Sequence, residues 1–208
     1  MKKLVTSVIL LLFLLGNNGT YGQFKPIKLI LKSGDSLTGL GKFSRGKKVK
    51  FKKNKASKAL KYNFKNLKRV QIYDEDEIIN YVYLKKKGKK IFRFYKELVR
   101  GEVSLYKIVV IGSAGGYGAV GHPGVPSGIR AGDSFSFVKY FIKRKEDNGV
   151  TRFWEESIFS KSFKKAALDY FYDCKIIVEK VKKKEYKVDN IVEMVEYYNT
   201  KCHINKNN

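Results

Sequence analysis

Charged and apolar side chains alternate with a period of two through much of this chain, and this alternation restricts the fold more than any other feature. The segment KKVKFKK, residues 47–53, sets Val49 and Phe51 between lysines, which is typical of a strand with one buried and one solvated face. Nine segments have strand character: IKLILK, SLTGLGKF, KKVKFKK, LKRVQIY, IINYVYL, KIFRFYK, EVSLYKIVVIG, SFSFVKYFIKRK and VTRFW. Because short connections join most of them, we predict that residues 23–154 form an antiparallel β-sheet or barrel-like body.

Turn signals separate these segments. Residues 33–35, Ser-Gly-Asp, predict a tight turn, and KKKGKK, residues 85–90, predicts a hairpin connection. The acidic run at residues 74–77 is contiguous, whereas a calcium loop needs spaced oxygen ligands, so we expect a charged hairpin tip. Asn148-Gly149 between two strand-like runs is a strong hairpin signal.

The last fifty residues change from period two to helical spacing. Over residues 155–208 we predict three helices, of which the second covers CKIIVEKVKKK. The apolar positions are Phe159, Phe163, Ala166, Ala167, Tyr170 and Phe171 in the first helix and Ile191, Val195, Tyr198 and Cys202 in the third. The predicted N-caps are Ser160, then Asp173, then Asp189 or Asn190. The predicted fold class is therefore α+β, a β body followed by a small C-terminal helical appendage.

Residues 1–22 have the order of a secretory signal peptide. Lys2 and Lys3 precede an apolar run at residues 4–15, and small and polar residues that suit cleavage before Gln23 follow it. The run is shorter than the roughly 20 residues that a membrane helix requires, and no later segment is long enough to span a bilayer. We expect an exported chain, whether periplasmic, associated with the outer membrane or secreted. An uncleaved amphipathic N-terminus is the alternative.

Glycines at positions 116–121 spell G-x-G-x-x-G, which in a dinucleotide-binding fold follows a strand and opens a helix. Pro123 and Pro126, among further glycines, prevent a helix at this place. Free nucleotides are also scarce outside the cytoplasm, so we expect no nucleotide cofactor. We predict a long Gly-rich loop over residues 112–132, with these candidate partner contacts: Tyr117, His122 and Arg130.

The two cysteines, Cys174 and Cys202, both lie in the predicted helical tail. In an oxidising compartment such a pair favours a disulfide, and two antiparallel helices would place the two positions side by side. Zinc normally takes four ligands, and His203 is the one strong ligand nearby, so we expect no metal site. Two free thiols are the remaining alternative.

The sequence lacks the familiar catalytic motifs. The two histidines, His122 and His203, lie in the glycine loop and near the C-terminus. The histidine of a catalytic triad must be held by packing and hydrogen bonds, which we expect at neither position. Ser162 stands three residues before Lys165, but the motifs that accompany S-x-x-K in hydrolases are missing. We therefore predict a non-enzymatic protein with no catalytic residues and no cofactor. A hydrolase with a carboxylate pair is an alternative that the sequence leaves open.

The formal net charge is +25, from 44 Lys and Arg against 19 Asp and Glu. Lysines interleave with aromatic residues in KKVKFKK, KKIFRFYK and FVKYFIKRK. This pattern fits a surface for an anionic polymer such as lipopolysaccharide, nucleic acid or an acidic glycan. Only seven of the cations are arginine, the residue suited to bidentate phosphate recognition. Solvated charge without a partner is the alternative, since strand alternation by itself places lysines outward.

Three features resemble uncharacterised secreted proteins of Bacteroidetes: a signal that ends in YGQ, the run RGEVSLYK, and the tail DYFYDCKIIVEKV…NIVEMVEYYNTKC. In the run, the pattern G-x-V-x-L-Y covers Gly101, Val103, Leu105 and Tyr106. In the tail, the matching positions are Asp173, Cys174, Ile191, Val192, Tyr198, Asn199 and Cys202, and Lys175 stands where such tails often have proline. The resemblance implies a β-rich body, export and the disulfide, and it implies no activity.

From these observations we expect an exported, non-enzymatic envelope or extracellular protein that acts as an interaction module. Its partner would be an envelope protein or, in the alternative, an anionic polymer.

Overall fold

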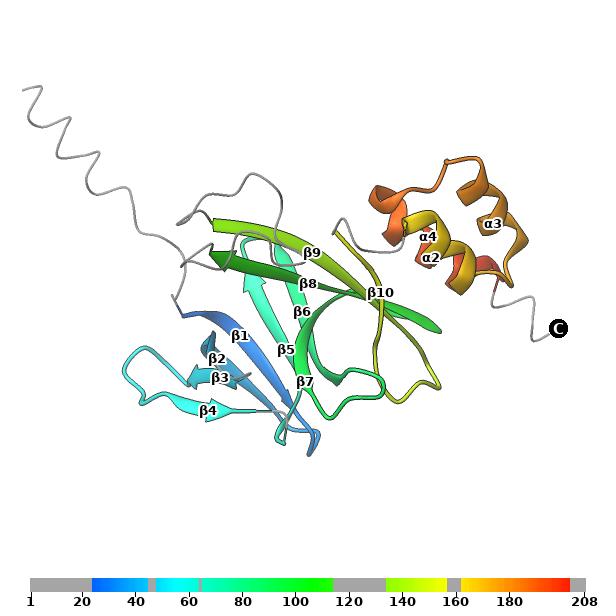
Figure 1. The fold of residues 1–208 in the computed structure, drawn as a ribbon. Helices are drawn as coiled ribbons and strands as arrows, with labels where there is room; N and C mark the ends of the chain where they lie inside the picture. The colour runs from blue at the N-terminus through cyan, green and yellow to red at the C-terminus, as the bar shows by residue number, and fades with distance from the viewer. Residues whose placement is uncertain (1–23, 45–47, 64, 114–133, 157–161, 203–208) are drawn as a thin grey trace, which may run out of the picture.

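The computed structural model describes residues 24–44, 48–63, 65–113, 134–156 and 162–202. Its ten strands form one antiparallel sheet in the order β10-β9-β8-β7-β6-β5-β1-β2-β3-β4, and a group of short helices lies at one end of the sheet (Figure 1). This arrangement, mostly β with a small helical C-terminal part, confirms the predicted α+β class at that level. The predicted signal peptide, residues 1–22, lies outside the described residues.

Nine of the ten strands were predicted from the sequence, and one was not. The strands are β1 (Lys25–Leu31), β2 (Ser36–Ser44), β3 (Lys48–Lys52), β4 (Leu60–Tyr62), β5 (Leu67–Asp74), β6 (Glu77–Lys85), β7 (Phe92–Val99), β8 (Val103–Ser113), β9 (Ser134–Arg144) and β10 (Thr151–Glu155). The missed strand, β4, has three residues and pairs only with β3 at the edge of the sheet. A strand this short shows no alternation from which to predict it.

The sheet is open, so the barrel-like alternative is wrong. Its edge strands are β4 and β10, and closure would require a continuous ladder between them. One part of the sheet does curl: Val150, just before β10, exchanges backbone hydrogen bonds of 2.9 Å with Lys85 and Lys87 at the end of β6. Val150 belongs there to a buried cluster with Val82, Tyr95, Tyr106 and Phe141.

All four predicted turns connect antiparallel strands, and two of them differ in geometry. A two-residue turn joins β5 to β6, with Glu75 in the left-handed conformation (φ 51°), so the acidic run is the hairpin tip that was predicted. Asn148-Gly149 joins two antiparallel strands as predicted, but within a longer connection, residues 145–150. A Cβ on Gly149 would lie 2.8 Å from the Lys85 carbonyl oxygen. Glycine is therefore needed here for the close approach of two backbones.

Strands β8 and β9 pair along their whole length, up to Ser113 opposite Ser134. Gly112 therefore belongs to β8 and not to the loop predicted from that residue. β8 is antiparallel to both of its neighbours, whereas the dinucleotide motif follows a strand of a parallel sheet. Residues 114–133 lie outside the described residues, and with them Tyr117, His122 and Arg130.

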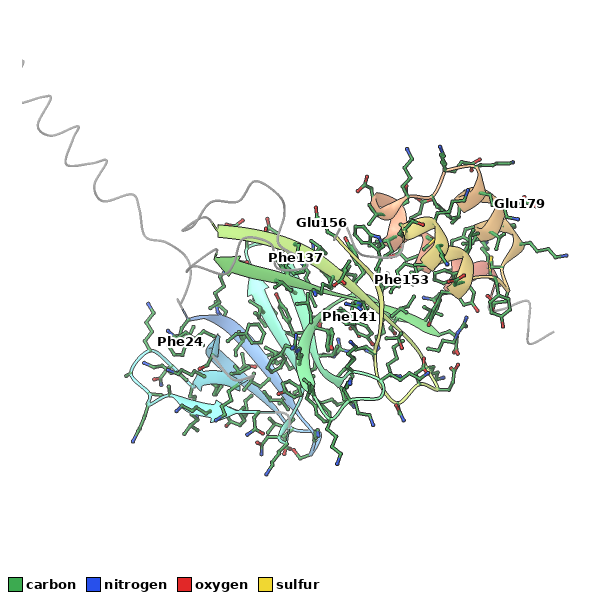
Figure 2. All side chains as sticks on the ribbon, in the orientation of Figure 1. Phe24, Phe137, Phe141, Phe153, Glu156 and Glu179 are labelled. Atoms are coloured by element: carbon green, nitrogen blue, oxygen red, sulfur yellow. A yellow bond between two sulfur atoms is a disulfide. The ribbon has the colours of Figure 1, made fainter. Side chains whose placement is uncertain are left out.

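The helical tail packs its apolar residues against one end of the sheet. It contains α2 (Phe163–Tyr170), α3 (Lys175–Lys182), the 3-10 turn η1 (Val188–Asn190), α4 (Ile191–Tyr197) and the final π-helical turn η2 (Tyr198–Cys202). Phe153 of β10 lies on the side of the helices (Figure 2), where its ring centroid is 6.0–6.1 Å from those of Phe163, Tyr170 and Phe171. No helix of the described residues is long and apolar enough to cross a membrane.

A buried cluster, the tail core, joins the helices to the sheet. The sheet contributes Val99, Val103, Leu105, Ile142 and Phe153, and the helical part contributes Ala166, Ala167, Phe171, Cys174, Ile177, Val181, Tyr186, Ile191, Met194, Val195 and Tyr198. The predicted apolar face of the third helix is thus confirmed at its buried positions.

The caps of α2 and α4 differ from the prediction in detail. Ser162 caps α2, because its hydroxyl oxygen accepts a hydrogen bond of 3.3 Å from the backbone N–H of Lys165; Ser160 lies outside the described residues. Asn190 holds the N-cap position of α4, as one of the two predicted alternatives. Its side-chain oxygen, however, accepts from the Lys187 N–H at 3.2 Å and not from the helix.

Asp173 does not cap α3, contrary to the prediction. The N-cap position belongs to Cys174, and the Asp173 carboxylate accepts a hydrogen bond of 2.7 Å from the Tyr198 hydroxyl. The buried Tyr198 hydroxyl therefore binds the carboxylate that the sequence pattern had assigned to the N-cap of the helix. Cys174 is joined to Cys202 by a disulfide, with 5.6 Å between the Cα atoms. This bond confirms the predicted pairing and excludes the free-thiol alternative.

The disulfide closes a loop with a sequence separation of 28 residues. We expect the double variant Cys174→Ser/Cys202→Ser to lose about 3–4 kcal/mol of the free energy of unfolding. Without the bond, the unfolded chain has more conformational entropy, and unfolding becomes more favourable. Chemical denaturation of both proteins, without reductant, measures the difference. A loss below about 1 kcal/mol would show that the bond contributes little to the folded state.

Alkaline pH should destabilise the fold. Burial, together with the negative charge of Glu193, raises the pKa of Tyr186 from the ordinary 10.0 to about 12. The folded state therefore favours the neutral phenol, and its contribution to stability is complete below pH 10 and is lost as the pH rises from about 10 through 12. Denaturation at pH 9, 10 and 11 should show this decline. In Tyr186→Phe the decline should be smaller, and an equal decline would exclude this assignment.

Candidate anion-binding pocket

A concave pocket of about 590 Å³ lies on the sheet, on the opposite face from the helical tail. We call it the basic pocket. Its lining residues come from β5 to β9 and from three connections: Lys32, Leu67, Lys68, Arg69, Val82, Tyr83, Leu84, Glu97, Arg100, Gly101, Glu102, Ser104, Tyr106, Lys143 and Lys145. They span more than a hundred positions in sequence, so only the folded sheet brings them together.

The strand register explains which side chains point into the pocket. Residues directly opposite in neighbouring strands share a face, and Glu97 pairs with Tyr106 while Ser104 pairs with Lys143. Arg144 pairs with Val103, a residue of the tail core, and therefore lies on the other face. Successive side chains of β9 thus point alternately toward the pocket and toward the tail.

Positive charge dominates the pocket. Six of its lining residues are Lys or Arg and two are Glu. For four of the cations, no side-chain hydrogen bond or ion pair is found within the described part of the chain: Lys32, Lys68, Arg100 and Lys145. A concave site with an excess of one sign of charge over apolar walls concentrates the potential and attracts counter-ions. The pocket therefore suits an anion.

The side of the pocket near β5 and β7 holds an internal ion pair. The Arg69 guanidinium donates to both carboxylate oxygens of Glu97, and one of these hydrogen bonds is 3.2 Å long. The side chains are only 15% and 9% exposed. Both charges are thus compensated within the wall, and the Arg69 guanidinium is not available to an incoming anion without loss of the pair.

Lys143 is held in place by backbone carbonyls. Its ammonium donates to the carbonyl oxygens of Arg144 and Lys145 at 3.0 and 3.1 Å. Carbonyl acceptors orient the ammonium but leave its charge uncompensated. Because an ammonium has three N–H donors, one remains for a ligand.

Two tyrosines form part of the walls. Tyr106 and Tyr83 are 5% and 7% exposed, and burial raises the pKa of each above its ordinary value. Both are therefore neutral phenols at physiological pH. Their rings contribute apolar wall area and little free ring face.

The carboxylates of the pocket bear on the alternative of a hydrolase with a carboxylate pair. Glu97 is the carboxylate most enclosed in the pocket, and both of its oxygens accept hydrogen bonds from Arg69. A glycosidase needs one carboxyl that can donate a proton to the leaving group, and a carboxylate gripped by a guanidinium is poorly suited to that role. Within the described ranges there is no group of three or more metal-ligating side chains.

This site was not predicted from the sequence. The predicted contact residues Tyr117, His122 and Arg130 lie outside the described residues, and the structure neither joins them to the pocket nor separates them from it. One signal was present: RGEVSLYK, noted for a resemblance, supplies five lining residues, which are Arg100, Gly101, Glu102, Ser104 and Tyr106.

Comparison of the chain with protein-family models, with curated proteins and with solved structures found no match in any of the three. The assignment of a function therefore depends on the residues themselves.

Removal of one partner from the Arg69–Glu97 pair should be costly. We expect Arg69→Leu to lower the free energy of unfolding by about 3–5 kcal/mol, since Glu97 would remain buried without its counter-ion. The double variant Arg69→Leu/Glu97→Leu should recover most of the loss. Urea denaturation of the three proteins measures this coupling, and a single variant as stable as the double one would rule out a structural pair.

Proposed function

We propose that this chain is an exported, non-enzymatic binding module whose basic pocket receives a charged group of an anionic glycan. The observation that carries the proposal is the clustering of Lys32, Lys68, Arg100 and Lys145 around one concave site. In a chain of net charge +25, cations without partners are common. Their arrangement around a walled pocket goes beyond what composition requires.

The shape of the pocket favours a sugar-sized group over a nucleic acid. Its volume of about 590 Å³ fits a small ligand site, whereas duplex DNA is bound along an extended surface. Proteins that bind single strands expose aromatic rings for base stacking, but Tyr83 and Tyr106 are almost fully buried. Lysines are also more frequent in the pocket than arginines. Lysine binds an anion as a point charge, without the bidentate geometry by which arginine recognises phosphate.

Export is supported by two independent features. The sequence begins with the pattern of a signal peptide, and both cysteines are joined in a disulfide. Such bonds persist in oxidising compartments. Anionic glycans are abundant at cell surfaces and outside cells, so the proposed ligand and the proposed location agree.

The test uses the mature chain, residues 23–208, with heparin, polygalacturonate, lipopolysaccharide, duplex DNA and neutral dextran. We expect an acidic glycan to bind more tightly than DNA. Four ionic contacts predict that affinity for a densely charged polymer falls about 50- to 150-fold between about 50 and 200 mM salt. Equal binding of all the polyanions would indicate unspecific charge attraction and would contradict the proposal.

A pair of charge-reversal variants locates the site. Lys68→Glu/Arg100→Glu alters the pocket, whereas Lys164→Glu/Lys182→Glu alters two exposed lysines of the tail helices by the same net charge. We expect glycan affinity to fall at least about tenfold further in the pocket variant than in the tail variant. Equal losses in the two variants would place the binding outside the pocket.

A further inference from the structure

The tail reaches the rear of the basic pocket through Asn199 in η2. The side-chain oxygen of Asn199 accepts a hydrogen bond from the Val103 N–H, and its amide nitrogen donates to the Val103 carbonyl oxygen, both at 2.8 Å. These two bonds satisfy the backbone N–H and carbonyl of Val103, as a neighbouring strand would do at the start of β8. They fix the backbone directly after residues 100–102, which line the pocket.

Gly101 allows this close approach. A Cβ built on Gly101 would lie 2.4 Å from the amide nitrogen of Asn199 and 2.6 Å from its Cγ. The turn that carries Arg100 and Glu102 into the pocket is therefore seated directly against the Asn199 side chain. A larger residue at position 101 would have to displace the Asn199 side chain from its hydrogen bonds to Val103.

The neighbouring tail residue, Tyr198, holds the second cationic segment. Its hydroxyl accepts a hydrogen bond of 2.8 Å from Arg144 and donates one of 2.7 Å to Asp173. Arg144 also donates to the Tyr170 carbonyl oxygen at 3.3 Å, and its guanidinium lies 5.0 and 5.3 Å from the Tyr170 and Tyr198 ring centroids.

Arg144 lies between two pocket residues. Lys143 and Lys145, on either side of it in sequence, both line the basic pocket. The two segments also meet directly, because the Lys145 N–H donates to the Glu102 carbonyl oxygen at 2.8 Å. The consecutive residues Tyr198 and Asn199 thus hold residues 143–145 and residues 100–102 from behind.

We propose that Tyr198 and Asn199, kept in place by the disulfide-closed tail, are positioning residues that set the spacing of the cations in the basic pocket. The inference rests on the proposed function of that pocket. Cations that face one pocket repel each other, so a binding site made of them gains affinity when the fold holds them in the bound arrangement beforehand. The tail supplies that restraint without touching the ligand.

The test compares Asn199→Ala with Ile177→Ala. Ile177 is fully buried in the tail core but belongs to neither cationic segment, so its truncation lowers stability without removing the two hydrogen bonds to Val103. We expect Asn199→Ala to weaken glycan binding about tenfold, the effect of removing one charge-assisted hydrogen bond to the ligand. The slope of the logarithm of its affinity against the logarithm of the salt concentration should decrease in magnitude by about 0.7–0.9 for each ionic interaction that the variant no longer makes with the glycan. Ile177→Ala should keep the wild-type affinity and slope while its unfolding midpoint falls at least as much.

Hydrogen exchange provides a readout that needs no ligand. In Asn199→Ala the amides of residues 100–105 should exchange faster than in Ile177→Ala, because the two hydrogen bonds that restrain this segment have been removed. Gly101→Ala, which retains both hydrogen-bonding partners and forces them apart, should have the same effect and serves if Asn199→Ala does not fold.

The outcomes separate the two proposals. If the wild type binds glycan but Asn199→Ala and Gly101→Ala match Ile177→Ala in affinity and in exchange, the positioning role is wrong and the pocket assignment stands. If the wild type fails to bind any acidic glycan while the exchange difference is present, the pocket assignment is wrong and the restraint by the tail stands. Loss of affinity in all three variants with equal salt slopes would point to general destabilisation and would overturn the positioning role.

Discussion

Tyr198 is fully buried between the tail and the sheet, and the rest of the structure depends on how its hydroxyl is satisfied. A buried hydroxyl without partners would cost a large part of the stability of a small domain. Here it accepts from Arg144 and donates to Asp173. These bonds satisfy the polar group inside the tail core. They also connect Arg144 of β9 and Asp173, just before α3, to Tyr198 of η2. The disulfide then closes the same tail a few residues further on.

The junction also determines what the opposite face of the sheet presents. In an extended strand successive side chains point to opposite faces, so Arg144 turns toward the tail while Lys143 and Lys145 turn toward the basic pocket. The same division occurs at β8, where Val103 enters the tail core and Ser104 lines the pocket. A tail that looks like an appendage in the sequence is therefore a support for a site on the far side of the sheet.

The charge of the protein has different roles at different places. Several carboxylates of the described residues lie in ion pairs, such as Lys25–Asp74, Lys87–Asp147 and Lys139–Glu155. The exposed pairs among these contribute little to stability. Around the basic pocket the cations surround a walled concavity, and there we propose that the excess of positive charge binds an anionic ligand.

The sequence by itself determined most of the secondary structure and the class of fold. Alternation, turn residues and helical spacing depend on neighbours within a few positions, which is why nine strands, the hairpin at residues 74–77 and the buried face of the last helix could be predicted from it. It also favoured the disulfide, because two cysteines leave one possible pairing, and the structure then excluded two free thiols. The open sheet, the use of Asp173 by Tyr198 and the basic pocket were decided only by the tertiary structure. Each depends on which strands become neighbours and which side chains meet across them, and residues as distant as Lys32 and Lys145 carry no local signal that they will share one pocket.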